Sequence, residues 1–122
     1  MMEPLMLTMS LQDDSILLNS AILEALERPR QVQILINDEA KMLVLRACTM
    51  DDQQAVVVPG EKVMQFEISG RSLLKRIRKL TGWMDDRSRM IVGEYLPAHQ
   101  AVRFNLMEAQ TVSEDQMGDA DV

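Results

Sequence analysis

The sequence has little of what most enzymes and secreted folds are built from: one cysteine, one histidine and only 3% aromatic residues among 122. Cys48 alone cannot form an intrachain disulfide, so we expect a cytoplasmic protein. His99 has no second histidine with which to share a metal, and a serine or cysteine nucleophile would have to rely on this one residue as its base. The sequence therefore predicts no catalytic residues, no metal site and no cofactor.

Long apolar runs are absent as well. No stretch approaches the roughly 20 apolar residues that a membrane-spanning helix needs. The first residues, MMEPLMLTMSLQDD, carry no cationic segment ahead of their apolar ones, so no secretory signal is expected. The five glycines, in contexts such as PGEK and TGW, do not form a phosphate-binding loop. These absences argue against a membrane protein and against an enzyme.

What the chain does have is enough apolar residues, 47%, to bury one core in a domain of this length. Segments with a two-residue apolar period are interrupted by two helical segments, which predicts a single small α+β domain over residues 1–112, an antiparallel sheet with two helices. We expect Ser69 to cap the second helix and Gly82 to end it. The expected strands are 5–11, 15–19, 30–37, 41–48, 55–58, 63–69, 89–96 and 100–109, and the expected helices are 20–28 and 71–81.

The order strand–strand–helix–strand–strand occurs twice, which predicts two duplicated ββαββ units. Leu18–Asn19 matches Ile68–Ser69, because in each case a strand ends and runs into a helix. In topology alone, this order resembles that of duplicated, saddle-shaped DNA-binding sheets, a likeness that carries no site residues. After Val112 the apolar pattern stops, and residues 113–122 hold four acids and no cation, so we expect a disordered acidic tail.

Positive charge is concentrated in one short region of an acidic chain. The formal net charge is −6, yet residues 71–89 hold seven cations and two acids. At 100° per residue, Leu73, Ile77 and Leu80 fall on one side of the expected helix and most of the cations fall on the other. A face of a single sign suits contact with phosphates or with an acidic protein surface, whereas a plain solvated face is the alternative interpretation.

Trp83 follows the basic helix directly, where its ring could stack on a base or cover the end of the helix as a core residue. Paired aspartates at 13–14, 51–52 and 85–86 are expected to stabilise turns, although adjacent aspartates also supply oxygen ligands to Mg²⁺ or Ca²⁺. The candidate binding residues are Arg71, Lys75, Arg76, Arg78, Lys79, Trp83, Arg87 and Arg89.

Together these features predict a small, non-enzymatic binding protein with a regulatory role, which docks an anionic partner, a nucleic acid in the first place, through the second helix. The alternative is a protein–protein interaction module with no nucleic-acid role, or a homodimer. In that homodimer Glu24 and Glu27 of the acidic first helix would face the basic helix of the partner. The acidic tail is expected to lie over the basic helix at low salt and to compete with an anionic partner.

Overall fold

The strands divide between two antiparallel sheets rather than forming the one sheet that the sequence predicts. The computed structural model describes residues 3–52, 54–58 and 65–112. The first sheet contains β1 (Met6–Ser10), β2 (Ser15–Asn19), β6 (Gln65–Ser69), β7 (Ser88–Val92) and β10 (Gln110–Val112). The second contains β3 (Gln31–Asn37), β4 (Met42–Cys48), β5 (Val56–Val57), β8 (Glu94–Leu96) and β9 (Ala101–Asn105). The likeness to one saddle-shaped sheet therefore does not extend to the arrangement of the strands.

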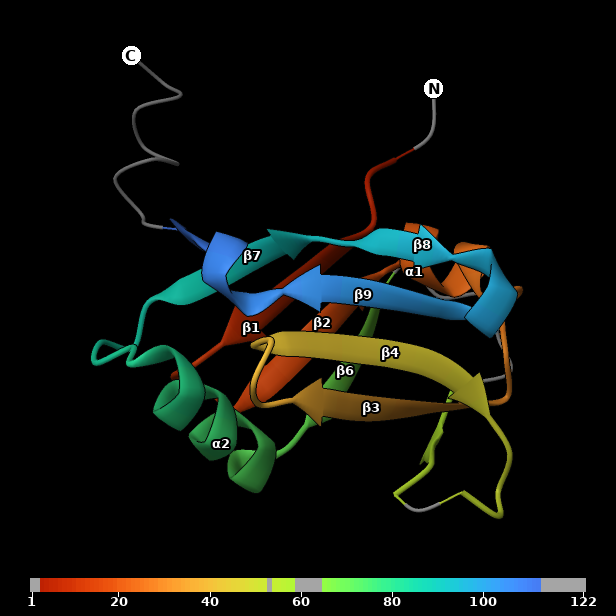
Figure 1. Ribbon diagram of the computed structural model, residues 1–122, viewed down its shortest axis with the longest axis horizontal. Helices are drawn as coiled ribbons and strands as arrows, with labels where there is room; N and C mark the ends of the chain where they lie inside the picture. The colour runs from red at the N-terminus through yellow and green to blue at the C-terminus, as the bar shows by residue number, and fades with distance from the viewer. Residues whose placement is uncertain (1–2, 53, 59–64, 113–122) are drawn as a thin grey trace.

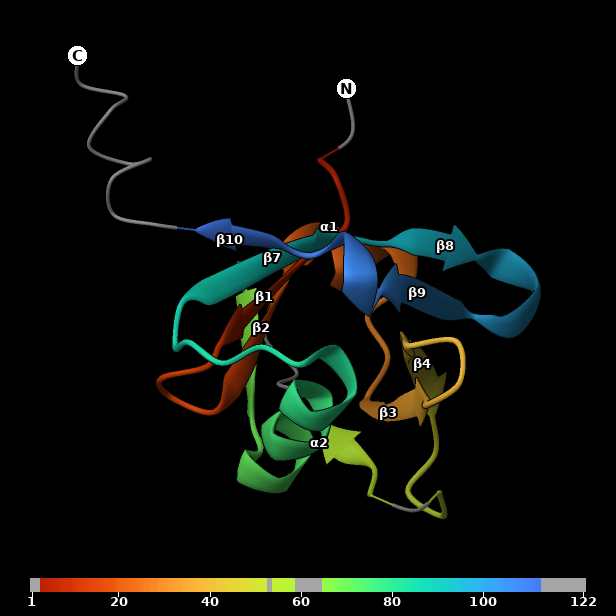
Figure 2. The ribbon, with the colours of Figure 1, turned by 60° about the vertical axis from the view of Figure 1, so that its left-hand side comes forward.

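Across the first sheet the strand order is β10-β7-β1-β2-β6, and across the second it is β5-β3-β4-β9-β8. The helices are α1 (Ser20–Ala25) and α2 (Arg71–Thr81), and they lie well apart from each other in both views of the ribbon (Figures 1 and 2). Among the described residues, no helix combines the length and the apolar character that crossing a membrane requires.

Each helix begins and ends where local chemistry dictates. Asn19 caps α1, because its side-chain oxygen accepts the backbone N–H of Ile22 at 3.2 Å. Helix α1 is shorter than the predicted 20–28, because Glu27 and Arg28 adopt left-handed backbone angles ahead of Pro29. Helix α2 has the predicted bounds, 71–81.

The sequence predicts the C-terminal end of α2 correctly but not the residue that caps its N-terminus. Gly82 ends the helix in the predicted left-handed conformation, with φ of 80°. At the other end, the residue in the capping position is Gly70 and not Ser69, and glycine has no side chain with which to cap the helix. The predicted serine cap is therefore wrong, and the first turn of α2 lacks a side-chain cap within the described part of the chain.

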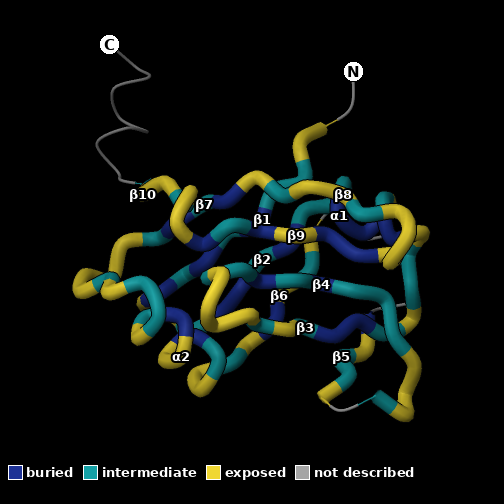
Figure 3. The backbone as a smooth tube through the Cα atoms, in the orientation of Figure 1, coloured by how far each residue is buried: buried dark blue, intermediate teal, exposed yellow. Residues whose placement is uncertain are grey.

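One apolar core unites both sheets and both helices. Buried residues alternate with less buried ones along strands such as β1, β4 and β7, as the two-residue period predicts (Figure 3). The sheets contribute Leu7, Met9, Ile16 and Leu18 on one side and Leu43, Leu45, Val102 and Phe104 on the other, and the helices contribute Ile22, Leu23, Leu74 and Ile77. The described residues thus form one small α+β domain.

The chain passes from the first sheet to the second between β7 and β8 (Figure 1). The residue between these two strands is Gly93. Its N–H donates to the carbonyl of Leu5 at 2.7 Å. A Cβ atom at this position would lie 2.6 Å from both Phe104 Cε1 and Val102 Cγ1. Only glycine lets the backbone approach the core this closely, so Gly93 allows one strand segment to serve two sheets.

The last predicted strand, 100–109, is also interrupted. Strand β9 ends at Asn105, whose side chain accepts the N–H of Met107 at 3.0 Å and so stabilises a 3-10 turn over Leu106–Glu108. After this turn the chain returns to the first sheet as β10, which pairs with β7. The predicted duplication of a ββαββ unit stays a prediction, and the predicted tail, 113–122, lies outside the described residues.

The close approach at Gly93 generates a test of the fold. We expect Gly93→Ala to lower the free energy of unfolding by about 1–3 kcal/mol, because the added methyl group has to displace the Phe104 and Val102 side chains. Urea denaturation measures this change. Val92→Thr, at the neighbouring exposed position, should stay within about 0.5 kcal/mol of the parent protein. Equal losses in the two variants would contradict the proposed role of Gly93.

Candidate functional site

Helix α2 is turned about its axis relative to the prediction. The sequence placed Leu73, Ile77 and Leu80 in the core, but the fully buried residues are Leu74 and Ile77, whereas Leu73 and Leu80 are half-buried. At 100° per residue this moves the centre of the buried face by about 60°. This rotation of α2 decides which of its cations face solvent and which contact the rest of the protein.

Three cations form an exposed stripe along α2, hereafter the cationic stripe: Arg71, Lys75 and Lys79. They lie four residues apart, so they follow one another along the same side of the helix. Lys75 and Lys79 are exposed and have no hydrogen bond or ion pair with any described residue. The Arg71 side chain is 89% exposed, and its contact with Asp14 is long, at 3.7 Å. The stripe is therefore open to a partner.

The remaining two cations of α2 bond to the protein itself. Arg76 donates to Asp38 at 2.7 Å, which links the helix to the turn between β3 and β4. Arg78 donates to the Asp86 carboxylate at 2.5 Å and also to the carbonyls of Asp85 and Leu11. Both guanidinium groups thus have structural partners that the helical periodicity could not reveal.

Trp83 and Arg89 form a compact unit behind the end of α2. The Arg89 guanidinium lies 4.4 Å from the centre of the Trp83 ring, a favourable cation–π arrangement. The Arg89 side chain is only 8% exposed, and its guanidinium donates to both carboxylate oxygens of Asp85 at 3.1 and 3.3 Å. Trp83 packs against the core, so the core interpretation of this residue describes its surroundings better than a free stacking surface. Arg87 is exposed, and its backbone N–H donates to Asp85 at 2.9 Å.

Asp85 is the common acceptor in this loop. The hydrogen bonds from the Arg89 side chain, and then the one from the Arg87 backbone, favour the charged carboxylate and lower the pKa of Asp85. In the pair at 51–52 the equivalent role falls to Asp52, which accepts the N–H of Thr49 at 2.9 Å. Near the first hairpin, Asp13 accepts the Ser10 hydroxyl at 3.0 Å. One aspartate of each pair thus makes the kind of local bond that stabilises a turn.

Chemistry that needs a cluster of titratable groups has little support in the described part of the chain. No group of three His, Cys, Asp or Glu side chains there could hold a metal ion. Burial, and then the nearby Asp52, raise the pKa of the Cys48 thiol, so the thiolate required of a nucleophile is disfavoured at neutral pH. His99 is exposed in the short helical turn Pro97–His99.

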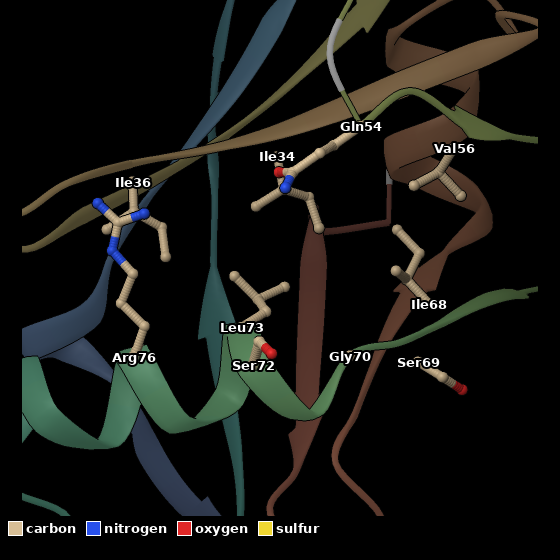
Figure 4. A pocket seen from close by; sticks show the side chains of 10 residues that line it. All are labelled: Ile34, Ile36, Gln54, Val56, Ile68, Ser69, Gly70, Ser72, Leu73 and Arg76. Carbon is tan, nitrogen blue, oxygen red and sulfur yellow. The ribbon is translucent and has the colours of Figure 1, made fainter.

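The sequence did not predict the cavity of about 380 Å³ that lies beside α2 (Figure 4). It is lined by residues of β3, the segment around β5, the end of β6 and the first turns of α2. The cavity depends on the partial exposure of Ile34 and Ile36, and that exposure depends on how β3 packs against α2. No periodicity in the sequence reports that packing.

The lowered pKa of Asp85 predicts a pH dependence of stability. The stabilisation is present above the ordinary pKa of an aspartate and is lost as the pH falls through the lowered value. Asp85→Asn should therefore lower the melting temperature by a few degrees at neutral pH, and the difference from the parent protein should vanish in strong acid. Thermal unfolding followed by circular dichroism over a pH series measures both.

The matched control is Asp51→Asn, because Asp51 is exposed and its side chain bonds no described residue. It should change the melting temperature little at any pH. A difference between Asp85→Asn and the parent protein that persists unchanged in acid would show that charge on Asp85 is not the cause.

Comparison with known protein families, with curated proteins and with solved structures finds no match for this chain. Of the eight candidate binding residues, the structure leaves Arg71, Lys75, Lys79 and Arg87 exposed without a close side-chain partner among the described residues.

Proposed function

We propose that this chain is a small, non-enzymatic binding and regulatory protein that docks an anionic partner, a nucleic acid in the first place, on the outer face of α2. The observation that carries the proposal is the cationic stripe of Arg71, Lys75 and Lys79, exposed on a helix that contains no acidic residue. Phosphate contacts supply most of the affinity of non-specific nucleic-acid binding, and lysine and arginine provide them.

The stripe is unfavourable to the isolated helix. Like charges four residues apart destabilise a helix by roughly 0.2–0.5 kcal/mol per pair, and the stripe contains two such pairs. Arg71 also lies in the first turn, where the helix dipole favours an anion and no acid is present. A bound anionic partner relieves both effects, which supports docking over a merely solvated face.

The spacing of the stripe fits an extended polyanion. Four residues of α-helix rise by about 6 Å, so the three cations are distributed over about 12 Å of helix axis. A backbone that carries one charge at each of several successive positions can contact all three at once. Arg87 lies beyond the end of the helix and would extend the contact.

The alternative, a homodimer joined by opposite charges, has weaker support. Its acidic partner surface was to be Glu24 and Glu27 on the first helix. Glu24 pairs with Arg28 at 2.7 Å within the same chain, and Glu27 lies beyond the end of α1. The acidic face that would meet the cationic stripe is thus partly neutralised.

We further propose that the chain consists of two duplicated ββαββ units, and that α2, the helix of the second unit, is the one specialised for binding. The pairing of strands supports this: β2 and β6, which each lead into a helix, pair with each other, and so do β4 and β9. In the same scheme β1 pairs with β7 as β5 pairs with β3. In this view the two halves share a plan, and only the second half carries the cationic stripe.

Single substitutions test the docking proposal. We expect Lys75→Gln and Lys79→Gln each to weaken binding of mixed-sequence DNA and RNA, and to reduce the slope of log affinity against log salt by about 0.7–0.9. Fluorescence anisotropy at low and moderate salt measures affinity and slope. Arg30→Gln is the matched control, since it removes one exposed positive charge far from α2 in the sequence.

The same samples separate the alternatives. Sizing chromatography should show one species whose size the substitutions at Lys75 and Lys79 do not change. If Arg30→Gln lowers the affinity as much as Lys75→Gln, the attraction reflects overall charge and the stripe is not the site. If Lys75→Gln and Lys79→Gln dissociate an oligomer instead, the interaction module without nucleic acid is the better account.

A further inference from the structure

The cavity beside α2 has the build of a small-molecule site. Its volume, about 380 Å³, lies within the range of natural ligand pockets. It opens between the edges of the two sheets: among the described residues, β6 pairs only with β2, and β5 pairs only with β3. In Figure 4, Val56 and Ile68 face each other across this gap, and Leu73 points from α2 toward Ile34.

One wall of the cavity is an apolar surface that the core leaves uncovered. Val32, Ile34 and Ile36 share one side of β3, because side chains alternate along a strand. Val32 is fully buried, but Ile34 and Ile36 are only half-buried, and both line the cavity. Branched aliphatic side chains of this kind would be stabilised by an apolar ligand that displaces water.

The other wall is polar and positively charged. Arg76 rises from α2 toward Ile36 at one end of the cavity (Figure 4). A guanidinium has five N–H donors, and Arg76 uses one on a described residue, Asp38. The first turn of α2 lies against the same space through Ser72 and Leu73, and none of the described residues that line the cavity is acidic.

We infer that this cavity binds a small aliphatic carboxylate, with the alkyl chain against Ile34, Ile36 and Leu73 and the carboxylate at Arg76. An anion matches the charge and the free donors of Arg76, whereas a cation would be repelled and an alcohol would leave the guanidinium with a weaker, neutral acceptor. The carboxylate of Asp38 competes for the same guanidinium. Both side chains of that pair are about half exposed, so the pair itself contributes little and a ligand can share or displace it.

The volume limits the length of the alkyl chain. At the roughly 30 Å³ that one molecule occupies in liquid water, the cavity holds about a dozen non-hydrogen atoms. Decanoate has this size, so it is the probe that we choose. The inference does not rest on the proposed function, because the cationic stripe projects from a different side of α2.

The first experiment is a titration of the whole protein with decanoate, followed by calorimetry and by amide NMR shifts. We expect one saturable site, with the largest shifts at Ile34, Ile36, Leu73 and Arg76. Decanol should bind severalfold more weakly, because it lacks the charge that Arg76 recognises. Equal binding of decanol, or no saturable binding of decanoate, would overturn the inference.

Two substitutions should change the affinity in opposite directions. Arg76→Gln should weaken decanoate binding severalfold, the size expected for losing an ion pair that is half exposed to solvent. Asp38→Asn should strengthen it severalfold, because it removes the competing carboxylate. Lys75→Gln, which changes the adjacent residue on the exposed side of the helix, should leave it unchanged. If Asp38→Asn and Arg76→Gln have the same effect as Lys75→Gln, the carboxylate does not lie at Arg76.

A second pair of variants tests the apolar wall. Ile36→Phe fills the cavity and should abolish decanoate binding, whereas Leu35→Phe places the same ring on the opposite side of β3 and should not. Circular dichroism shows whether each variant is folded. If a folded Ile36→Phe protein binds decanoate as the parent does, the ligand lies elsewhere.

Discussion

The burial of Leu74 and Ile77 sets the rotation of α2, and the surface chemistry of the molecule follows from that rotation. Both side chains are fully buried, so turning the helix would expose apolar surface to water. In the orientation that they impose, the cationic stripe of Arg71, Lys75 and Lys79 faces solvent. The same rotation brings Leu73 and Arg76 to the cavity. One hydrophobic contact thus sets both candidate surfaces.

Arginine and lysine serve different purposes around this helix. Arg76, Arg78 and Arg89 each bond an aspartate, and Arg78 and Arg89 also bond backbone carbonyls. A planar guanidinium with several donors suits such bridging, whereas the ammonium group of a lysine acts as a compact point charge. Lys75 and Lys79 bond no described residue and stay in water. The count of cations in the segment therefore exceeds the charge that a partner can reach.

The cavity and the crossing at Gly93 both arise from the way the two sheets meet. On one side, Gly93 lets the chain continue from β7 into β8, so the sheets share a strand segment. On the other side, β5 and β6 do not pair within the described part of the chain. The gap leaves Ile34 and Ile36 half-exposed beside α2. The two sheets are thus connected through β7 and β8, whereas β5 and β6 stay unpaired with each other, and a ligand-sized space remains between them.

The sequence by itself determined the local structure: most strands, the bounds of α2, its left-handed end at Gly82 and the clustering of cations on it. These follow from periodicity and capping, which act over a few residues. Two sheets in place of one, the interruption at Gly93 and the cavity could not be predicted, because they depend on which distant segments pack together. The same holds for the cations: Arg76 meets Asp38, which is 38 residues away, and Arg78 meets Leu11, 67 residues away. Only the tertiary structure, by bringing such partners into contact, decided which charges remain free.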